Sequence, residues 1–287
     1  MINIKKSPIQ EIEFQNKPFL VKRDDLLHSD FSGNKARKFF YFLKNEFSSI
    51  KTLISHGSNQ SNAMYSLSVL CKLRGWNFIY YTNHISSYLV DNPQGNYKYA
   101  LVNDMQIIVK DDFSKLDILH DDSILFIEEG GALEEASYGL KILASEIEDY
   151  KQNYNIDNLK IFLPSGTGTT ALFLQKYLNI EVLTCACVGD EKYLKKQFFE
   201  LECDEKKHPT ILKRIKKFHF GKLYKENYLL WKELYSQTQI EFDLLYDPVG
   251  WNTLLHNYDS KFTYLYIHQG GLLGNESMIH RYLHKYF

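Results

Sequence analysis

The sequence predicts an α/β fold in which parallel strands form sheets that helices cover on both faces. Short apolar runs rich in β-branched or aromatic residues alternate with helical patterns along the 287 residues. The runs are apolar along their length, which is typical of strands buried on both sides. Hydrophobic residues make up 44% and charged residues 24% of the chain, as in a globular protein with a sizeable core.

The individual elements follow in order from these patterns. The predicted strands are 51–55, 76–81, 106–109, 124–127, 160–163, 181–188 and 262–267. The predicted helices are 36–47, 61–74, 94–103, 132–150, 168–178, 190–202, 226–237 and 275–285. In the first helix apolar residues recur at spacings of three and four. Gly75 follows the second helix as a C-cap residue.

Charge and cysteine content narrow the function. The chain carries 34 basic and 35 acidic residues, so its net charge of −1 offers no attraction to nucleic acid or to an anionic membrane. A basic run over 206–217 is expected to be a solvated helix face. No stretch approaches the roughly 20 apolar residues of a membrane span. The cysteines match no zinc spacing, so we expect no metal and a reducing, cytoplasmic setting; they are Cys71, Cys185, Cys187 and Cys203.

Three small polar loops each follow a predicted strand and precede a helix. They are 55–62, 164–170 and 268–271, and all are rich in hydroxyl, amide or glycine groups. Ligand sites in open α/β sheets form at the carboxyl ends of the strands. Three such loops at equivalent positions therefore predict one shared site.

Lys35 lies at the start of the first helix, after a turn formed by Ser32, Gly33 and Asn34. Backbone N–H groups and the positive end of the helix dipole favour a neighbouring anion there and oppose the protonated amine. In a dry site Lys35 can therefore be a free amine near neutral pH and attack a carbonyl. The alternative is an ordinary lysine on a solvated first turn.

The second loop has the features of an anion cradle. Glycines let the backbone approach, and N–H groups at a helix start and threonine hydroxyls donate. Its members are Ser165, Gly166, Thr167, Gly168 and Thr169. It lacks the Gly-Lys-Ser/Thr of a P-loop and the third glycine of a dinucleotide fingerprint. A monophosphate suits its size, and a glycine-rich corner without a ligand is the alternative.

Two further pairs can serve either structure or chemistry. Ser61 and Asn62 start the second helix, where they can cap it or turn a hydroxyl and an amide toward a ligand. Tyr246 and Asp247 precede a proline, as in a type I turn. In a site, the acid would partner a cationic ring nitrogen, and the tyrosine, with a depressed pKa, would act as a general acid or base. Together with the lysine and the cradle, these groups are what pyridoxal phosphate requires.

These motifs, in this order, resemble the 1-aminocyclopropane-1-carboxylate (ACC) deaminase / D-cysteine desulfhydrase family. The family's lysine motif is matched in this chain by Gly33-Asn34-Lys35-Ala36-Arg37-Lys38, which is preceded by Lys22-Arg23-Asp24-Asp25. The family's next motif resembles His56-Gly57-Ser58-Asn59-Gln60-Ser61-Asn62-Ala63. The later elements look like Glu129-Gly130-Gly131 through Tyr138-Gly139, Ser165-Gly166-Thr167-Gly168-Thr169-Thr170, Leu245-Tyr246-Asp247 and His268-Gln269-Gly270-Gly271. The resemblance spans nearly the whole chain.

The resemblance implies a pyridoxal-phosphate enzyme of the tryptophan synthase β-like fold, fold type II, with an open twisted parallel sheet in each of two domains. The large, cofactor-binding domain would comprise 1–47 and 123–287, and the small α/β domain 48–122. The active site would lie in the cleft between them. A small amino-acid substrate and a homodimer are implied by the family alone.

The roles of single residues follow from the resemblance, position by position. Lys35 would be the Schiff-base lysine, and Ser61 and Tyr246 would share in catalysis. The cofactor would contact Lys35, Lys38, Asn62, Ser165, Gly166, Thr167, Gly168, Thr169, Asp247 and Gln269. The substrate would bind at Ser58, Asn59, Gln60 and Ser61.

The chain departs from the family pattern mainly on the substrate side. Ala63 replaces a larger polar residue, and Gln269 stands where a threonine is expected. A second active-site tyrosine is expected near Gly221, where Leu223 and Tyr224 compete for the role. We therefore expect deamination or elimination on a small amino acid, as in D-cysteine desulfhydrases or ACC deaminases. The alternatives are β-replacement, as in cysteine synthases, and a non-catalytic cofactor- or amino-acid-binding protein.

Overall fold

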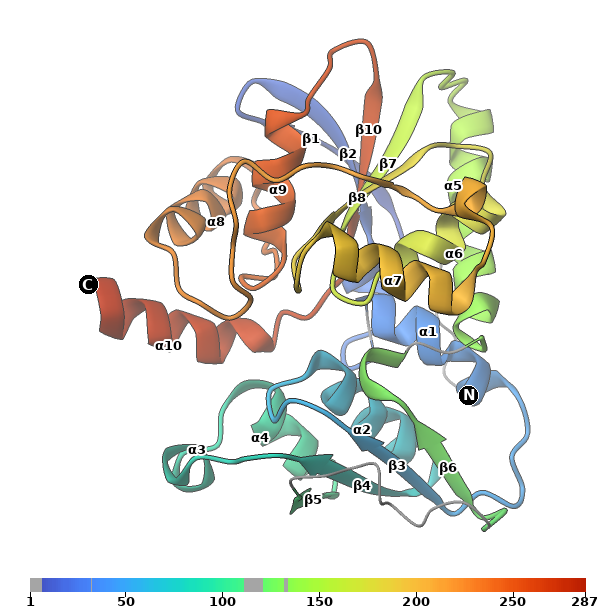
Figure 1. Cartoon of the computed structure of the whole chain (residues 1–287), viewed down its shortest axis with the longest axis vertical. Coiled ribbons are helices and arrows are strands. Elements are labelled where there is room, and N and C mark those ends of the chain that lie inside the picture. Colours follow the sequence, from blue (N-terminus) through green and yellow to red (C-terminus); the bar gives the residue numbers. More distant parts are fainter. Residues whose placement is uncertain (1–6, 32, 111–120, 132–133) are drawn as a thin grey trace.

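The computed structural model describes residues 7–31, 33–110, 121–131 and 134–287. In these ranges the chain forms two lobes, each around its own β-sheet, with helix α1 (Gly33–Lys44) between them (Figure 1). The predicted α/β architecture with parallel sheets is confirmed.

The larger sheet has the strand order β1-β2-β10-β7-β8-β9. Its strands are β1 (Ile9–Phe14), β2 (Lys17–Arg23), β10 (Thr263–His268), β7 (Leu159–Ser165), β8 (Val182–Ala186) and β9 (Thr210–Ile211). All pairs are parallel except β1 with β2, which forms an antiparallel hairpin. Its two turn residues, Gln15 and Asn16, both have positive φ, as a tight hairpin turn requires. The sequence patterns did not predict this hairpin or the short β9.

Helices cover both faces of the larger sheet. One face of β10 packs, through Leu265 and Ile267, with α5 (Ala136–Asn153) and α6 (Thr169–Tyr177). The other face packs, through Tyr264 and Tyr266, with α8 (Lys225–Thr238) and α9 (Asp247–His256). The alternation follows from the two-residue period of a strand. Helices α7 (Glu191–Leu201) and α10 (Gly274–Tyr286) complete this lobe (Figure 1).

The smaller sheet is entirely parallel, with the strand order β5-β4-β3-β6. Its strands are β3 (Thr52–His56), β4 (Asn77–Thr82), β5 (Met105–Val109) and β6 (Ile124–Ile127), and its helices are α2 (Asn62–Arg74), α3 (Ser87–Asp91) and α4 (Gly95–Val102). Because β6 pairs with β3, this sheet continues beyond residue 122. The expected domain boundary at 122/123 therefore has to move past Ile127.

Helix α1 belongs to both lobes. It contacts α5 of the larger lobe and α2 of the smaller one. Its residues Ala36, Phe39 and Phe42 lie in the core cluster of the smaller lobe, although the sequence assigned this helix to the large domain. The residues that follow its first turn are thereby fixed from two sides.

Two helices differ from the sequence-based expectation. Helix α9 begins at Asp247, where an isolated turn was one interpretation of Asp247-Pro248. Proline is compatible with the first turn of a helix, because no intrahelical partner exists for its missing N–H there. The short α3 was not predicted. Within the described ranges, no helix combines the length and the apolarity needed to cross a bilayer.

Candidate active site

The starts of α1 and α6 and the loop after β10 meet at the carboxyl ends of the strands. The backbone N–H of Asn34 donates to the carbonyl of Gln269 at 3.0 Å. The Gln269 side chain in turn donates to the carbonyl of Pro164, at the end of β7, at 2.7 Å. The loops after β7 and β10 therefore join the lysine motif directly, as their positions at strand ends predicted.

Two lysine amines converge on one carbonyl oxygen. The Nζ atoms of Lys35 and Lys38 each donate to the carbonyl of Gly130 at 3.0 Å. Burial lowers the pKa of Lys35 from its ordinary 10.5 to about 8. Burial also lowers the pKa of Lys38 well below its ordinary value, and the neighbouring charge of Lys35 lowers it further. At neutral pH the pair therefore offers both a positive charge and a free amine within one site.

The anion cradle lies beside this pair. A Cβ placed on Gly130 would lie 3.1 Å from the methyl group of Thr167. Helix α6 starts at Thr169, and the hydroxyls of Thr167 and Thr169 are 3.1 Å apart. The hydroxyl oxygen of Thr170 is buried without a hydrogen-bond partner among the described residues.

One member of the predicted cradle turns away from it. The hydroxyl of Ser165 lies 2.6 Å from that of Thr184, whose own proton goes to the carbonyl of Leu163. Ser165 is thus held between β7 and β8, and only its backbone can contribute to the cradle. A cofactor contact through the Ser165 backbone stays a prediction.

The loop after β3 is held by the smaller lobe. The Ser61 hydroxyl accepts the N–H of Ala63 at 3.1 Å and caps α2, the structural alternative considered for it. Asn59 donates to the carbonyl of His84, and Gln60 to that of Gln94. The carbonyl of Ser58 accepts the hydroxyl of Tyr80. The amide side chains of Asn59 and Gln60 are thus bound within the smaller lobe.

Asn62 faces the glycine-rich end of the larger lobe. Its Oδ1 accepts from the side chain of Asn96 at 2.6 Å. A Cβ placed on Gly271 would lie 2.5 Å from Nδ2 of Asn62 and 3.2 Å from Oδ2 of Asp243. Asn62 therefore bridges the small lobe and the loop after β10, with its amide nitrogen beside that loop.

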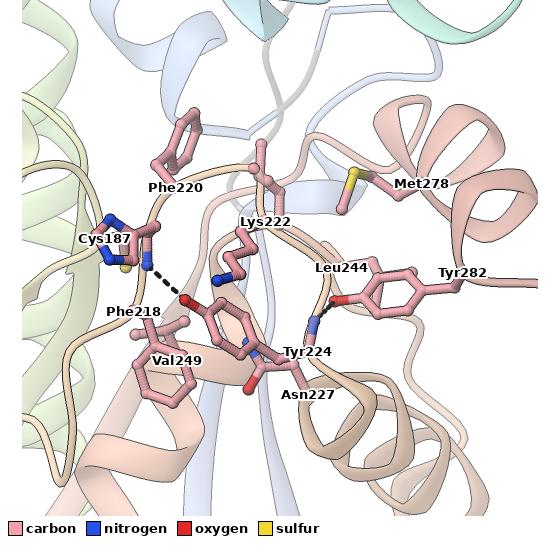
Figure 2. Close-up of a pocket in the computed structure, with 13 residues that line it drawn as sticks. Cys187, Phe218, Phe220, Lys222, Tyr224, Asn227, Leu244, Val249, Met278 and Tyr282 are labelled. Atoms are coloured by element: carbon pink, nitrogen blue, oxygen red, sulfur yellow. Dashed lines mark hydrogen bonds between the residues drawn. The ribbon is translucent and has the colours of Figure 1, made fainter. Parts of the chain in front are cut away.

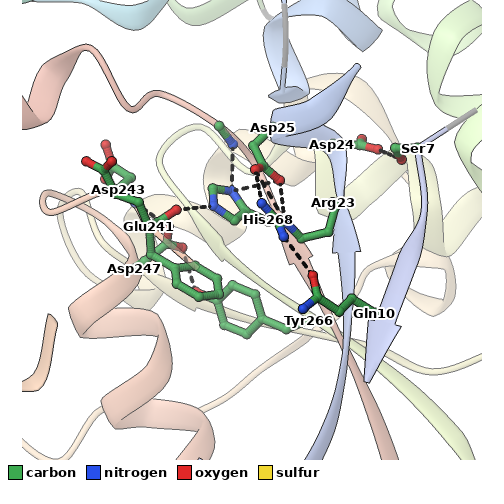
Figure 3. A network of polar contacts seen from close by, with 12 residues as sticks. Ser7, Gln10, Arg23, Asp24, Asp25, Glu241, Asp243, Asp247, Tyr266 and His268 are labelled. Carbon is green, nitrogen blue, oxygen red and sulfur yellow. Dashed lines mark hydrogen bonds and ion pairs between the residues drawn. The ribbon is translucent and has the colours of Figure 1, made fainter. Parts of the chain in front are cut away.

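Asp247 lies in the core and not in the cleft. Its Oδ1 accepts the hydroxyl of Tyr266 at 2.6 Å, and its Oδ2 accepts the N–H of Asp243 at 2.9 Å (Figure 3). Burial, together with the charge of Asp243, raises its pKa well above the ordinary value. With both oxygens engaged by the protein, Asp247 does not fit the predicted contact to a ring nitrogen.

Tyr246 lies beside the cradle, but its ionisation differs from the expectation. A Cβ placed on Gly166 would lie 3.4 Å from the Tyr246 hydroxyl, so the phenol borders the cradle. Burial raises the pKa of Tyr246, and the charges of Asp243, Cys187 and Glu129 raise it further. The phenol therefore stays protonated and can donate a hydrogen bond or a proton, but it is not a base.

The segment near Gly221 supplies a phenylalanine to the site. The rings of Phe220 and Tyr246 are 5.1 Å apart. Leu223 is buried under α10, and the Tyr224 hydroxyl accepts the N–H of His219. A small cavity of about 10 Å³, the room of one water molecule, lies behind this segment (Figure 2).

Sequence reasoning missed three functional groups. The carbonyl of Gly130 receives both lysines, and the neighbouring Glu129 carboxylate adds negative charge near Lys35. A Cβ placed on Gly57 would lie 2.8 Å from Glu129 Oε1. Asp243 is buried, and burial raises its pKa to about 7. For Glu129 and Gly130 the paired-glycine segment was an available signal, whereas Asp243 had none.

Comparisons with known proteins give a consistent result. No protein-family model matches the chain. The rice (Oryza sativa subsp. japonica) protein named "Putative D-cysteine desulfhydrase 2, mitochondrial" is 23% identical over 339 residues, covering 94% of this chain and 81% of the rice protein. The crystal structure of an ACC deaminase homologue matches with a TM-score of 0.77 and 20% identity, covering 98% of this chain and 94% of the homologue. A pyridoxal 5'-phosphate-dependent aspartate racemase matches with a TM-score of 0.63 and 10% identity over 93% of this chain and 90% of the racemase.

The structural matches show that the fold is that of the tryptophan synthase β-like enzymes. The rice relative matches nearly the whole chain in sequence, and the lysine, serine–asparagine, threonine-loop and glycine motifs occur in the expected order. In sequence and in fold, the chain is therefore similar to the ACC deaminase / D-cysteine desulfhydrase family of fold type II enzymes.

Proposed function

We propose that this protein is a pyridoxal-phosphate-dependent enzyme that deaminates a small amino acid and releases ammonia and a 2-keto acid. The observation that carries the proposal is the pair of lysine amines on the Gly130 carbonyl, next to the threonine loop at the start of α6. A nucleophilic amine and an anion site on one wall are what the aldehyde and the phosphate of this cofactor require.

The residues present fit the cofactor. Lys38 is buried and Lys35 is half-buried, and among the described residues no carboxylate is hydrogen-bonded to either amine, which favours an added anion. Among the described residues the buried Thr170 hydroxyl has no hydrogen-bond partner, and the α6 N-terminus offers N–H groups that no intrahelical bond uses. Lys35 would hold the cofactor covalently, Lys38 and 166–170 would hold its phosphate, and the Asn62 amide would reach its ring oxygen.

When bound, the cofactor supplies a conjugated ring that takes up the negative charge developing at the substrate Cα. Lys35, with a pKa of about 8, removes the Cα proton as a free amine and returns a proton as an ammonium. Tyr246 and Ser61 offer hydroxyls to the substrate or leaving group. The N–H groups of 57–62 bind the substrate carboxylate, and the two lobes exclude water from the site.

Cysteine elimination is the reaction we favour. The Cα–H and Cβ–S bonds break, and hydrolysis of the remaining carbon–nitrogen bond gives hydrogen sulfide, ammonia and pyruvate. The rice relative is named a D-cysteine desulfhydrase, which supports this choice over ring opening. The four cysteines are free thiols, which supports a cytoplasmic setting. β-Replacement is the second candidate, since Lys35 would serve it equally.

Purified protein tests the proposal. The wild type with added pyridoxal phosphate should become yellow, with absorption at about 410–430 nm, and Lys35→Ala should not. Sulfide and keto acid should then be released from D-cysteine, L-cysteine or, without sulfide, ACC. A protein that stays colourless with added cofactor would refute the function. Colour without release from any of these substrates would favour β-replacement or binding alone.

A further inference from the structure

The loop after β10 contains a side chain that extends the sheet beyond its backbone ladder. Backbone pairing between β10 and β7 ends at Tyr266 and Phe162. Two residues further along β7, the carbonyl of Pro164 is met by Nε2 of Gln269 at 2.7 Å. The Gln269 side chain therefore holds the two strand ends together where the ladder has stopped.

The other end of the same amide reaches the lysine helix. Oε1 of Gln269 accepts from Nδ2 of Asn34 at 3.0 Å, and the Gln269 carbonyl accepts the Asn34 N–H at 3.0 Å. The Pro164 carbonyl can only accept, so the amide orientation is fixed by chemistry. Gly33 allows this close approach: its φ is +67°, and a Cβ there would lie 2.0 Å from the Gln269 carbonyl oxygen.

The buried side chain of His268 restrains the loop after β10. It is fully buried, and its Nδ1 accepts the N–H of Gly270 at 3.1 Å, so Nε2 carries the proton that goes to the Glu241 carbonyl at 2.7 Å (Figure 3). Its ring stacks on Phe242 at 4.6 Å. Burial lowers the pKa of His268, although Asp25, 3.9 Å from Nδ1, opposes this. A neutral imidazole thus holds the loop backbone in one arrangement.

We propose that Gln269 is a positioning residue that holds the Lys35 end of α1 against the phosphate-loop end of β7. Asn34 directly precedes Lys35, and Pro164 directly precedes Ser165. The amide pair thereby sets the spacing between the lysine amine and the threonine loop. Since its carboxamide is bound at both ends by the protein, Gln269 supports the site instead of contacting the cofactor. We call the two side-chain hydrogen bonds of Gln269, to Asn34 and to Pro164, the joint. The consequence for cofactor binding rests on the proposed function, whereas the joint itself does not.

Three variants and one matched control test the joint. Gln269→Leu keeps the side-chain volume but removes both amide bonds, and Asn34→Ala removes only the bond to Oε1. The double variant, with Asn34→Ala and Gln269→Leu combined, completes a double-mutant cycle. Asn158→Ala is the control, because its amide binds the carbonyl of Lys261 and the hydroxyl of Thr263 at the opposite end of the same two strands. Amide hydrogen exchange is measured without cofactor, and cofactor affinity by absorbance titration.

We expect Gln269→Leu to speed exchange in 34–38 and 165–170 and to weaken cofactor binding about tenfold, and Asn34→Ala about threefold. The double variant should resemble Gln269→Leu. Asn158→Ala should lower the melting temperature without changing cofactor affinity.

Unchanged exchange in both single variants, or additive losses in the double variant, would overturn the joint. If Asn158→Ala lost as much cofactor affinity as Gln269→Leu, the effect of the joint on cofactor binding would be no more than a general loss of stability. Should Gln269→Leu fail to fold, Asn34→Ala still decides, because it keeps the bond to Pro164. If the wild type binds no cofactor, the proposed function is refuted. The hydrogen-exchange data, which are measured without cofactor, still test the joint.

Discussion

Lys35 and Lys38 share one acceptor, the carbonyl of Gly130. Placing two amines this close in a buried site disfavours two positive charges there, so one of them loses its proton easily. Burial is the first cause of the lowered pKa of both lysines. The charge of Lys35 lowers the pKa of Lys38 further, so at neutral pH Lys35 keeps its proton, and it becomes a free amine above its pKa of about 8.

The pH dependence of cofactor capture follows from this pair. Only the free amine attacks, so the rate should rise as pH increases through the pKa of about 8 and level off near pH 9. Between pH 7 and pH 9 we expect an increase of about tenfold. Stopped-flow absorbance measures it directly. A rate that still climbs above pH 10 would show an unperturbed lysine and contradict the assignment.

Tyr246 and Asp247 show how neighbours in sequence separate in role. The Tyr246 hydroxyl borders Gly166 of the cradle, while the Asp247 carboxylate points into the core toward Tyr266. The two side chains at the start of α9 point in different directions, so this motif brings only Tyr246 to the cradle. Asp247 instead fixes the start of α9, through the N–H of Asp243.

Among the secondary-structure elements, helix α1 is held in place by a buried ion cluster. Its Arg37 is buried between two carboxylates, with Nη2 at 2.9 Å from both Asp24 Oδ1 and Glu146 Oε2. Lys22 of β2 binds the same Glu146 at 2.6 Å. This buried ion cluster joins β2, α1 and α5, and Arg37 lies two residues after Lys35 in α1.

Arg37→Met should destabilise the cofactor-free protein by about 3 kcal/mol, because it leaves buried carboxylates without their main partner. Thermal unfolding followed by circular dichroism measures the loss. Lys160→Met is the matched control, since Lys160 pairs with Glu181 at 2.8 Å near the surface of the same lobe, and its loss should be below about 1 kcal/mol. Equal losses in the two variants would show that the buried cluster has no special weight.

At the scale of the whole molecule, the site draws on both lobes. Asn62 and the loop after β3 come from the smaller sheet, while the threonine loop and the loop after β10 come from the larger one. Helix α1 has one face in each lobe. A ligand held by residues of both lobes therefore couples their unfolding.

Cofactor binding should raise the melting temperature and make the two lobes unfold in a single transition. At a pyridoxal phosphate concentration 100 times the dissociation constant, linkage gives about 2.7 kcal/mol of stabilisation. Calorimetry of the cofactor-free protein should show a broader or double transition, which becomes one sharper transition at higher temperature with cofactor. A shift confined to one of two transitions would contradict a site shared between the lobes.

Sequence patterns alone predict the class of fold and the positions of the loops. Alternating apolar strands and amphipathic helices require parallel sheets covered by helices, and strand ends then gather the three polar loops and Lys35. The β1–β2 hairpin escaped prediction because short polar-edged strands have a weak pattern. The boundary after β6 escaped because strand pairing is not visible in composition.

Which side chains face the site depends on contacts between residues that are distant in the sequence. Gln269 lies 235 positions from Asn34 and 105 from Pro164, yet its amide joins them. Ser165 and Asp247 are turned into the core by Thr184 and Tyr266, which lie on other strands. Local sequence fixes caps, turns and faces, because those depend on neighbours along the chain. The direction of a polar side chain depends on distant partners, which only the packed molecule brings within hydrogen-bonding distance.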